Sequence, residues 1–232
     1  MWYIVALIIM TMIYFVTVYL MKYMKNTKLW SFVFCSAIFL LYISLVIKVY
    51  RDVGPYDWNF RNTLPVANVS PFMFGIIPIL LILPRKIKNH LLLLISLLTF
   101  GMFFSVVMGC VFNAIRNYKF HLHFMLDYFA HILLSLFGIY LIRSRRVEFN
   151  FKNCVISSSV ILAVAVTMMG LNVIFDTSFF GLSLNGKHNI YNNVLVSNSY
   201  LSALLYFTGL IVVLALGGII SKIFNKESLK IE

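Results

Sequence analysis

Long apolar runs alternate with short polar stretches along the whole chain. A helix needs about 20 predominantly apolar residues to cross the hydrocarbon core of a bilayer, and seven runs reach this length. They are Trp2–Met21, Leu29–Val49, Leu64–Leu83, Leu91–Ala114, Phe124–Ile142, Cys154–Phe175 and Leu201–Ile223. The pattern predicts an all-α fold, a polytopic membrane helix bundle of about seven transmembrane helices that forms a single domain over residues 1–232.

Composition supports a membrane environment. Hydrophobic residues make up 62% of the chain and charged residues 11%, and the mean hydropathy is +0.94. A water-soluble domain has no surface for this much apolar side chain. The first run has no basic stretch before it and no small-residue cleavage pattern, so we expect it to remain as a span. The three cysteines lie apart and form no metal or redox motif.

The positions of the Lys and Arg residues predict the orientation of the bundle. Cytoplasmic loops of membrane proteins carry an excess of these residues. With the N-terminus outside, thirteen of them fall on the cytoplasmic side and six on the outer side. We therefore expect an outer N-terminus and a cytoplasmic C-terminus, in an integral multi-pass protein of a bacterial plasma membrane. The net charge of +12 then reflects topology and contacts with membrane lipids, and we expect no nucleic-acid partner.

The five prolines fall in one 30-residue stretch, from Pro55 to Pro84, which covers the third predicted span and its approach. Proline removes an intrahelical hydrogen bond and clashes with the preceding turn. Broken backbone at membrane depth is tolerated only where protein or a polar cavity satisfies it. We expect the third span to form the wall of a cavity that opens outward, with ordinary proline kinking as the alternative.

The strongest local pattern lies at the start of the fifth predicted span. His123, Asp127, His131 and Ser135 follow one another at intervals of four residues, so they form one slowly drifting stripe on a helix. At 1.5 Å per residue, His131 lies about 12 Å deeper than His123. Ionisable groups inside a span usually face the bundle interior and mark a functional path.

Three interpretations of the stripe remain open. Asp127 can fix the tautomer of His131 and increase its basicity, as a general base requires. Asp127 and His131 can also bind a metal, although no other group of potential metal ligands lies nearby in the sequence. The third interpretation is that the pair joins helices by buried hydrogen bonds. We expect no metal and no cofactor, since the sequence has no HExxH motif and no Gly-rich phosphate loop.

Several other residues are candidates for the same site. His123 is an alternative orienting group, and Ser70 is the candidate nucleophile, which requires a base in contact with it. The candidate substrate-binding residues are Asn68, Trp58, Arg61, Tyr128, Ser135 and Asn193.

A family resemblance rests on the order of these features. Trp58 precedes Leu64-Pro65 at the start of a span, a His-bearing span ends in Leu-Phe-Gly-Ile-Tyr-Leu (136–141), and Phe175-Asp176-Thr177 follows in an outer loop. Over about residues 29–223 the chain resembles the YwaF-like integral membrane family. That family includes the eukaryotic transmembrane protein 164 acyltransferases, which act on phospholipid acyl chains.

The resemblance implies acyl transfer, with a difference at the reacting residues. In the family the third span opens with Leu-Pro-Leu-His-Leu-Cys, in which the Cys carries the acyl group and a His of the fifth span serves it. Here the stretch reads Leu64-Pro65-Val66-Ala67-Asn68-Val69-Ser70, without that His and Cys. His131 matches the fifth-span His. Ser70 lies one residue after the position of the family Cys, so it replaces the thiol only if the register shifts by one residue.

Three classes of function are consistent with the sequence. The first is a lipid acyltransferase or lipid hydrolase with an outward-facing His/Asp site. The second is a small proton-coupled transporter or substrate-binding membrane subunit, in which Asp127 and His131 relay protons or hold a solute. The third is a non-enzymatic membrane scaffold that acts through its basic cytoplasmic loops.

Overall fold

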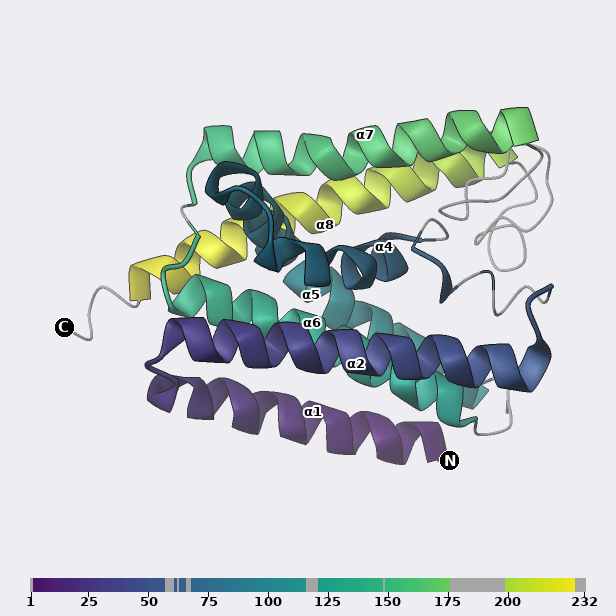
Figure 1. Ribbon diagram of the computed structural model, residues 1–232, viewed down its shortest axis with the longest axis horizontal. Coiled ribbons are helices and arrows are strands. Elements are labelled where there is room, and N and C mark those ends of the chain that lie inside the picture. Colours follow the sequence, from purple (N-terminus) through teal and green to yellow (C-terminus); the bar gives the residue numbers. More distant parts are fainter. Residues whose placement is uncertain are drawn as a thin grey trace.

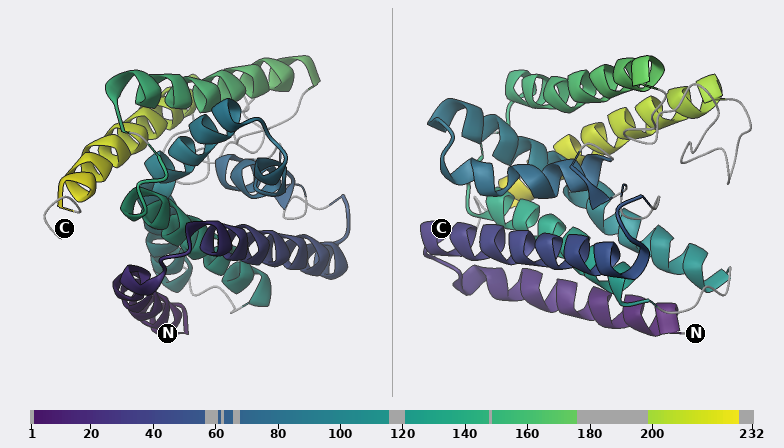
Figure 2. Two further views of the ribbon diagram at one scale, coloured as in Figure 1. Left: turned by 60° about the vertical axis from the view of Figure 1, so that its left-hand side comes forward. Right: turned by 45° about the vertical axis from the view of Figure 1, so that its right-hand side comes forward.

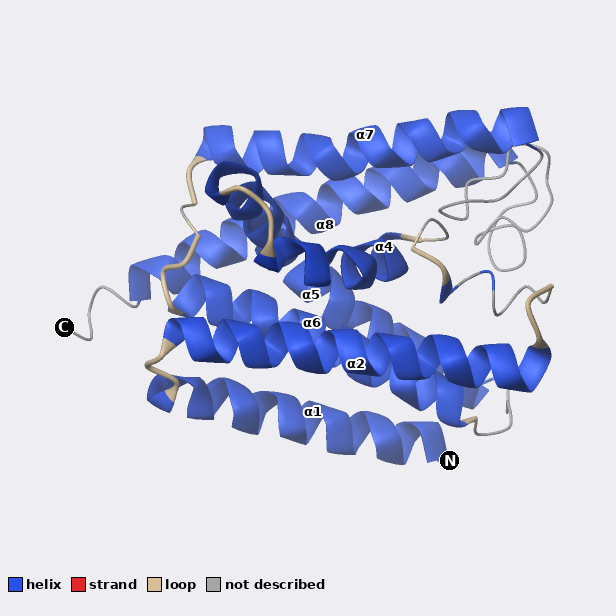
Figure 3. Cartoon of the chain, in the orientation of Figure 1, coloured by secondary structure: helices blue, strands red, loops and turns tan. Residues whose placement is uncertain are grey.

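The computed structural model describes residues 2–56, 61, 63–65, 68–115, 121–147, 149–175 and 199–227. These ranges form helices and connecting loops, with no strand among them (Figure 3). The elements in chain order are α1 (Trp2–Leu20), η1 (Met21–Tyr23), α2 (Thr27–Val53), α4 (Val69–Ile76), η2 (Pro78–Leu81), α5 (Arg85–Ile115), α6 (Leu122–Arg143), α7 (Phe151–Phe175) and α8 (Ser199–Glu227).

Six helices of the described ranges are long and apolar enough to cross a membrane. The predicted polytopic all-α bundle is therefore confirmed, but the third predicted span is not one continuous helix. In its place are α4, which has 8 residues, and the short 3-10 helix η2. Pro78 has no amide hydrogen to donate to the preceding turn, so the α-helix ends before it.

The broken segment nevertheless runs the length of the bundle. In Figure 1, α2 ends at one end of the bundle, and α5 begins at the other, so the chain between them crosses from end to end. The start of α1 and the end of α8 also lie at opposite ends. We name the end that contains residues 20–28, 84–88, 143–147, 149–152 and 222–227 the basic end, because most Lys and Arg residues lie there. The positive-inside rule assigns it to the cytoplasm and the opposite end to the outside.

Helices α5 and α6 form the centre of the bundle. Figure 2 shows α1 and α2 on one side of this pair and α7 and α8 on the other. In α6, 78% of the most apolar stretch is buried, against 17% in α1 and in α7. Apolar side chains on the outer helices remain exposed in large number, as expected where lipid is the solvent.

Two glycines allow close approach of helices to α5. A Cβ atom on Gly138 of α6 would lie 1.8 Å from Thr99 Oγ1, and one on Gly217 of α8 would lie 1.9 Å from the carbonyl oxygen of Leu97. Small residues at such contacts let transmembrane helices pack backbone to backbone. The position of α8 against α5 therefore depends on the missing side chain at Gly217.

We expect Gly217→Ala to lower the free energy of unfolding by ~1–3 kcal/mol, because α8 must move away from the backbone of α5. Gly170→Ala is the matched control, since a Cβ there meets nothing within 4 Å and replacing a mid-helix Gly by Ala is neutral or stabilising. Thermal unfolding of the detergent-purified variants, followed by tryptophan fluorescence, measures both effects. Equal unfolding midpoints for the two variants would contradict the close packing of α8 against α5 at Gly217.

Candidate functional site

A cavity of about 200 Å³ lies between α2, α4 and α6, near the outer end of the bundle. Pro71 and Phe74 of the broken third segment form one wall, and Asp127 of α6 is part of another. The full set of residues around it is Tyr42, Leu45, Val49, Thr63, Pro71, Phe74, His123, Phe124 and Asp127. The expected cavity wall at the third segment is therefore present, opposite the His/Asp stripe.

The ionisable groups of the cavity continue toward the outer end of α2. The Nδ1 atom of His123 lies 3.9 Å from Asp52 Oδ2, and Asp52 Oδ1 accepts a hydrogen bond of 2.7 Å from Lys48 Nζ. His123 also packs against Phe124, with 4.3 Å between ring centroids. Among the described residues, no three His, Cys, Asp or Glu side chains gather as a metal site.

Asp127 holds the ring of His131 in one orientation. The Nδ1 atom of His131 lies 2.8 Å from the backbone carbonyl oxygen of Asp127 and 3.4 Å from its carboxylate Oδ1. Both neighbours are acceptors, so Nδ1 carries the hydrogen and donates it. The other ring nitrogen, Nε2, is then left with the free lone pair that a general base needs.

Phe74 contacts His131 and also lines the cavity. Its ring meets the imidazole edge to face, with 5.3 Å between centroids and 88° between planes. Phe74 lines the cavity whereas His131 is buried, with a side chain that is 10% exposed. Asp127 and Phe74 thus line the cavity, whereas His131, which contacts both of them, does not.

The stripe turns away from the cavity at its deep end. Four residues on an α-helix advance by about 400°, so each step along the stripe drifts by about 40°. Ser135 is three steps from His123 and faces α5 and α1. Its hydroxyl donates a 2.8 Å hydrogen bond to the carbonyl oxygen of Thr99 and lies 3.0 Å from Tyr14 Oη. In this position Ser135 joins three helices.

Four other sequence-predicted residues, Tyr128, Asn68, Ser70 and Arg61, do not line the cavity. Tyr128 faces α5, where its hydroxyl accepts a 2.6 Å hydrogen bond from Asn113. Asn68 caps α4 by accepting a 2.8 Å hydrogen bond from the amide of Val69. Ser70 lies one turn before Phe74 on the same face of α4 but is not among the residues around the cavity, and Arg61 is exposed. Trp58 and Asn193 lie outside the described residues.

Two polar groups of the cavity were not predicted. The Tyr42 hydroxyl donates a 2.8 Å hydrogen bond to the carbonyl oxygen of Thr63, and both residues line the cavity. This bond fixes the approach to α4 against α2. Neither residue belongs to a sequence motif or to a series of polar residues spaced one helical turn apart, so the sequence gives no signal for them.

The geometry predicts that Ser135 supports the fold. Ser135→Ala removes a partner of the buried Tyr14 hydroxyl, at a cost of ~1–3 kcal/mol in unfolding free energy. In the Tyr14→Phe/Ser135→Ala double variant both hydroxyls are gone, so we expect a smaller loss than the sum of the two single losses. Thermal midpoints of the four proteins measure this coupling, and strictly additive losses would argue against the contact.

Comparison with known proteins agrees with this architecture. The model of the TMEM164 family matches residues 1–220, which includes the first span and the whole cavity. No curated protein and no solved structure is measurably similar to the chain. The sequence-based link to the transmembrane protein 164 proteins is confirmed, while the YwaF-like label stays a prediction. This integral, multi-pass membrane protein therefore belongs to the TMEM164 family.

Proposed function

We propose that this protein transfers or hydrolyses acyl chains of membrane lipids at the outer cavity, with His131 as the general base and Asp127 as its orienting partner. The observation that carries the proposal is the contact of His131 Nδ1 with two acceptor oxygens of Asp127, which leaves Nε2 as the basic nitrogen. Family membership and the acyltransferase resemblance described above support the same chemistry.

The size and lining of the cavity suit part of a lipid. At about 200 Å³ it is smaller than the roughly 300–1,000 Å³ of sites that enclose a whole ligand. Its walls are mainly apolar, with His123, Asp127, Thr63 and the Tyr42 hydroxyl as polar exceptions. In the proposal the ester group and the first methylenes of an acyl chain enter the cavity, and the rest of the lipid stays in the bilayer.

The reaction requires a nucleophile other than the family Cys. Val69 takes the place of that Cys and is buried, whereas Ser70 follows it on α4. The Ser70 hydroxyl gives its proton to His131 Nε2 as its oxygen bonds to the ester carbonyl carbon. The ester C–O bond then breaks, and the departing lipid alkoxide takes the proton from the imidazolium.

The second half of the reaction returns the protein to its starting state. Water, or the hydroxyl of a second lipid, gives a proton to His131 and attacks the acyl-Ser70 ester. The Ser70 oxygen leaves, recovers the proton, and the free acid or the new lipid ester is released. Phe74 packs against His131, and Ser70 does not line the cavity. The Phe74 ring therefore has to turn aside for His131 Nε2 and the Ser70 hydroxyl to reach the ester.

Alanine variants of purified protein in liposomes test this mechanism. A positioned general base contributes roughly 10²–10⁴-fold, so we expect His131→Ala to lower acyl exchange by at least 100-fold, and Ser70→Ala to abolish the covalent acyl-protein adduct. The readout is mass spectrometry of the lipids and of the protein. His90→Ala is the matched control, since His90 bonds Ser157 between α5 and α7, away from the cavity. Undiminished acyl exchange in folded His131→Ala would end the proposal.

A second candidate function, proton-coupled transport, is favoured by one specific observation. Asp52, His123, Asp127 and His131 follow one another from the outer end of α2 into the bundle, with 3.9 Å between His123 and Asp52 and 3.4 Å between His131 and Asp127. Such a line of ionisable groups along a broken helix is typical of transporters.

Proton uptake in proteoliposomes separates the two candidates. A transporter loses proton movement in Asp127→Asn, because the amide cannot accept and release the proton, and His90→Ala again serves as the control. We expect no proton movement above that of empty liposomes for the wild-type protein. Uptake that requires Asp127 would favour transport over acyl chemistry.

A further inference from the structure

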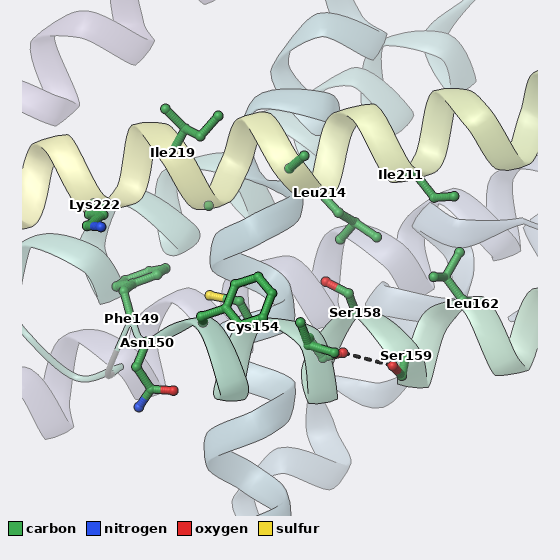
Figure 4. Close-up of a pocket in the computed structure, with 14 residues that line it drawn as sticks. Phe149, Asn150, Cys154, Ser158, Ser159, Leu162, Ile211, Leu214, Ile219 and Lys222 are labelled. Carbon is green, nitrogen blue, oxygen red and sulfur yellow. Dashed lines mark hydrogen bonds between the residues drawn. The ribbon is translucent and has the colours of Figure 1, made fainter.

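A second and larger cavity lies on the opposite side of the bundle. It is a groove of about 830 Å³ between α7 and α8. Both helices pack mainly against α5 and make little contact with each other, so a wedge remains open between them. Ser158, Ala215 and Gly218 are among its lining residues, and their small side chains leave the wedge unfilled. In Figure 4, Ser158 points from α7 toward α8, and Ile211 and Leu214 point back toward α7.

The groove covers the depth of one membrane leaflet. Its lining runs from Asn150 to Leu162 on α7 and from Lys222 back to Ile211 on α8. At 1.5 Å per residue these stretches are roughly 17–18 Å long, and one leaflet contributes about half of the roughly 30 Å hydrocarbon core. The groove begins at the basic end, so it lies in the leaflet that the charge asymmetry assigns to the cytoplasm.

Charge is present only at the mouth of the groove. Lys222 is the one charged residue among the described residues that line it, and in Figure 4 it points from α8 toward Phe149. The mouth also lies at the N-terminus of α7, where Asn150 accepts a 2.8 Å hydrogen bond from the amide of Asn153. A helix N-terminus and a Lys both favour a negative group. Deeper in, the groove is lined mainly by apolar side chains.

We propose that this groove binds one anionic phospholipid of the basic-end leaflet, with an acyl chain between α7 and α8 and the phosphate at Lys222. Basic pockets between transmembrane helices on the cytoplasmic side bind anionic head groups. The volume falls within the roughly 300–1,000 Å³ range of ligand sites. Lys222 at the mouth and the mainly apolar interior of the groove match the anionic head group and the acyl chain of one phospholipid.

The site is independent of the outer cavity. It shares no lining residue with the first cavity and lies at the other end of the bundle. The bound lipid fills the wedge and joins α7 to α8, which otherwise touch little. The proposal therefore stands or fails separately from acyl chemistry at His131.

Native mass spectrometry of the full chain tests the proposal. The protein is incubated with equal amounts of phosphatidylglycerol, which is anionic, and phosphatidylcholine, which is zwitterionic. We expect one phosphatidylglycerol to be retained in preference. One Lys near the surface contributes about a fivefold preference for anionic lipid, so Lys222→Gln should reduce the preference by about that factor. Lys25→Gln is the matched control, because Lys25 is exposed at the same end but does not line the groove.

A second pair of variants tests the acyl-chain part of the site. Ala215→Trp fills the groove and should remove the retained lipid of either kind. Leu216→Trp is its control, because the neighbouring Leu216 is exposed and is not a lining residue. Cys154 supplies an independent readout: its thiol lines the groove, whereas Cys35 and Cys110 are buried. Phosphatidylglycerol should slow its alkylation in the wild-type protein but not in Ala215→Trp.

Three outcomes would overturn the proposal. The first is equal retention of the two lipids by the wild-type protein. The second is an unchanged preference in Lys222→Gln. The third is a dimer that Ala215→Trp dissociates, which would identify a second copy of the chain as the occupant.

Discussion

A bilayer supplies no water to backbone groups, so every amide and carbonyl at membrane depth must find its partner within the protein. Six long helices meet this requirement by themselves. The segment from Asn68 to Leu81 cannot, because Pro78 divides it into α4 and η2. It packs against α2 and α6, and the Tyr42 hydroxyl donates a hydrogen bond to the carbonyl oxygen of Thr63 just before it. The outer cavity exists because a short, irregular segment occupies a position where a full helix would otherwise pack.

The architecture of the chain was largely predicted from its sequence. The exception is the third predicted span, which is not one continuous helix. Run length and the position of Lys and Arg residues identify six helices and the arrangement of their ends. The apolar run over residues 64–83 predicts a seventh helix. Hydropathy measures the free energy of moving side chains out of water, so it does not show whether the backbone hydrogen bonds of a helix are continuous. The positions of the prolines indicate where the helix is interrupted. They indicate that Pro78 ends the helix and that Pro71 faces a cavity.

The candidate site was also predicted only in part: the spacing of residues along one helix is visible in the sequence, whereas contacts between helices are not. Spacing along α6 is sufficient to place His123, Asp127 and His131 near one another. The same spacing groups Ser135 with them, but the accumulated drift turns that residue toward Thr99 and Tyr14. Tyr42, Thr63 and Phe74 come from other elements and are brought to the cavity by tertiary packing alone. Only the packed structure shows that Phe74, rather than open space, lies beside His131.

The Tyr14–Ser135 contact has a consequence for biosynthesis. The two residues are separated by 121 positions, so α1 enters the membrane long before its partner has been translated. At roughly 5–20 residues per second, the ribosome needs about 6 to 24 s to add the intervening chain. During this interval the phenol of Tyr14 faces lipid or the insertion machinery. The contact between α1 and α6 therefore forms only after α6 has been translated, well after α1 has been made.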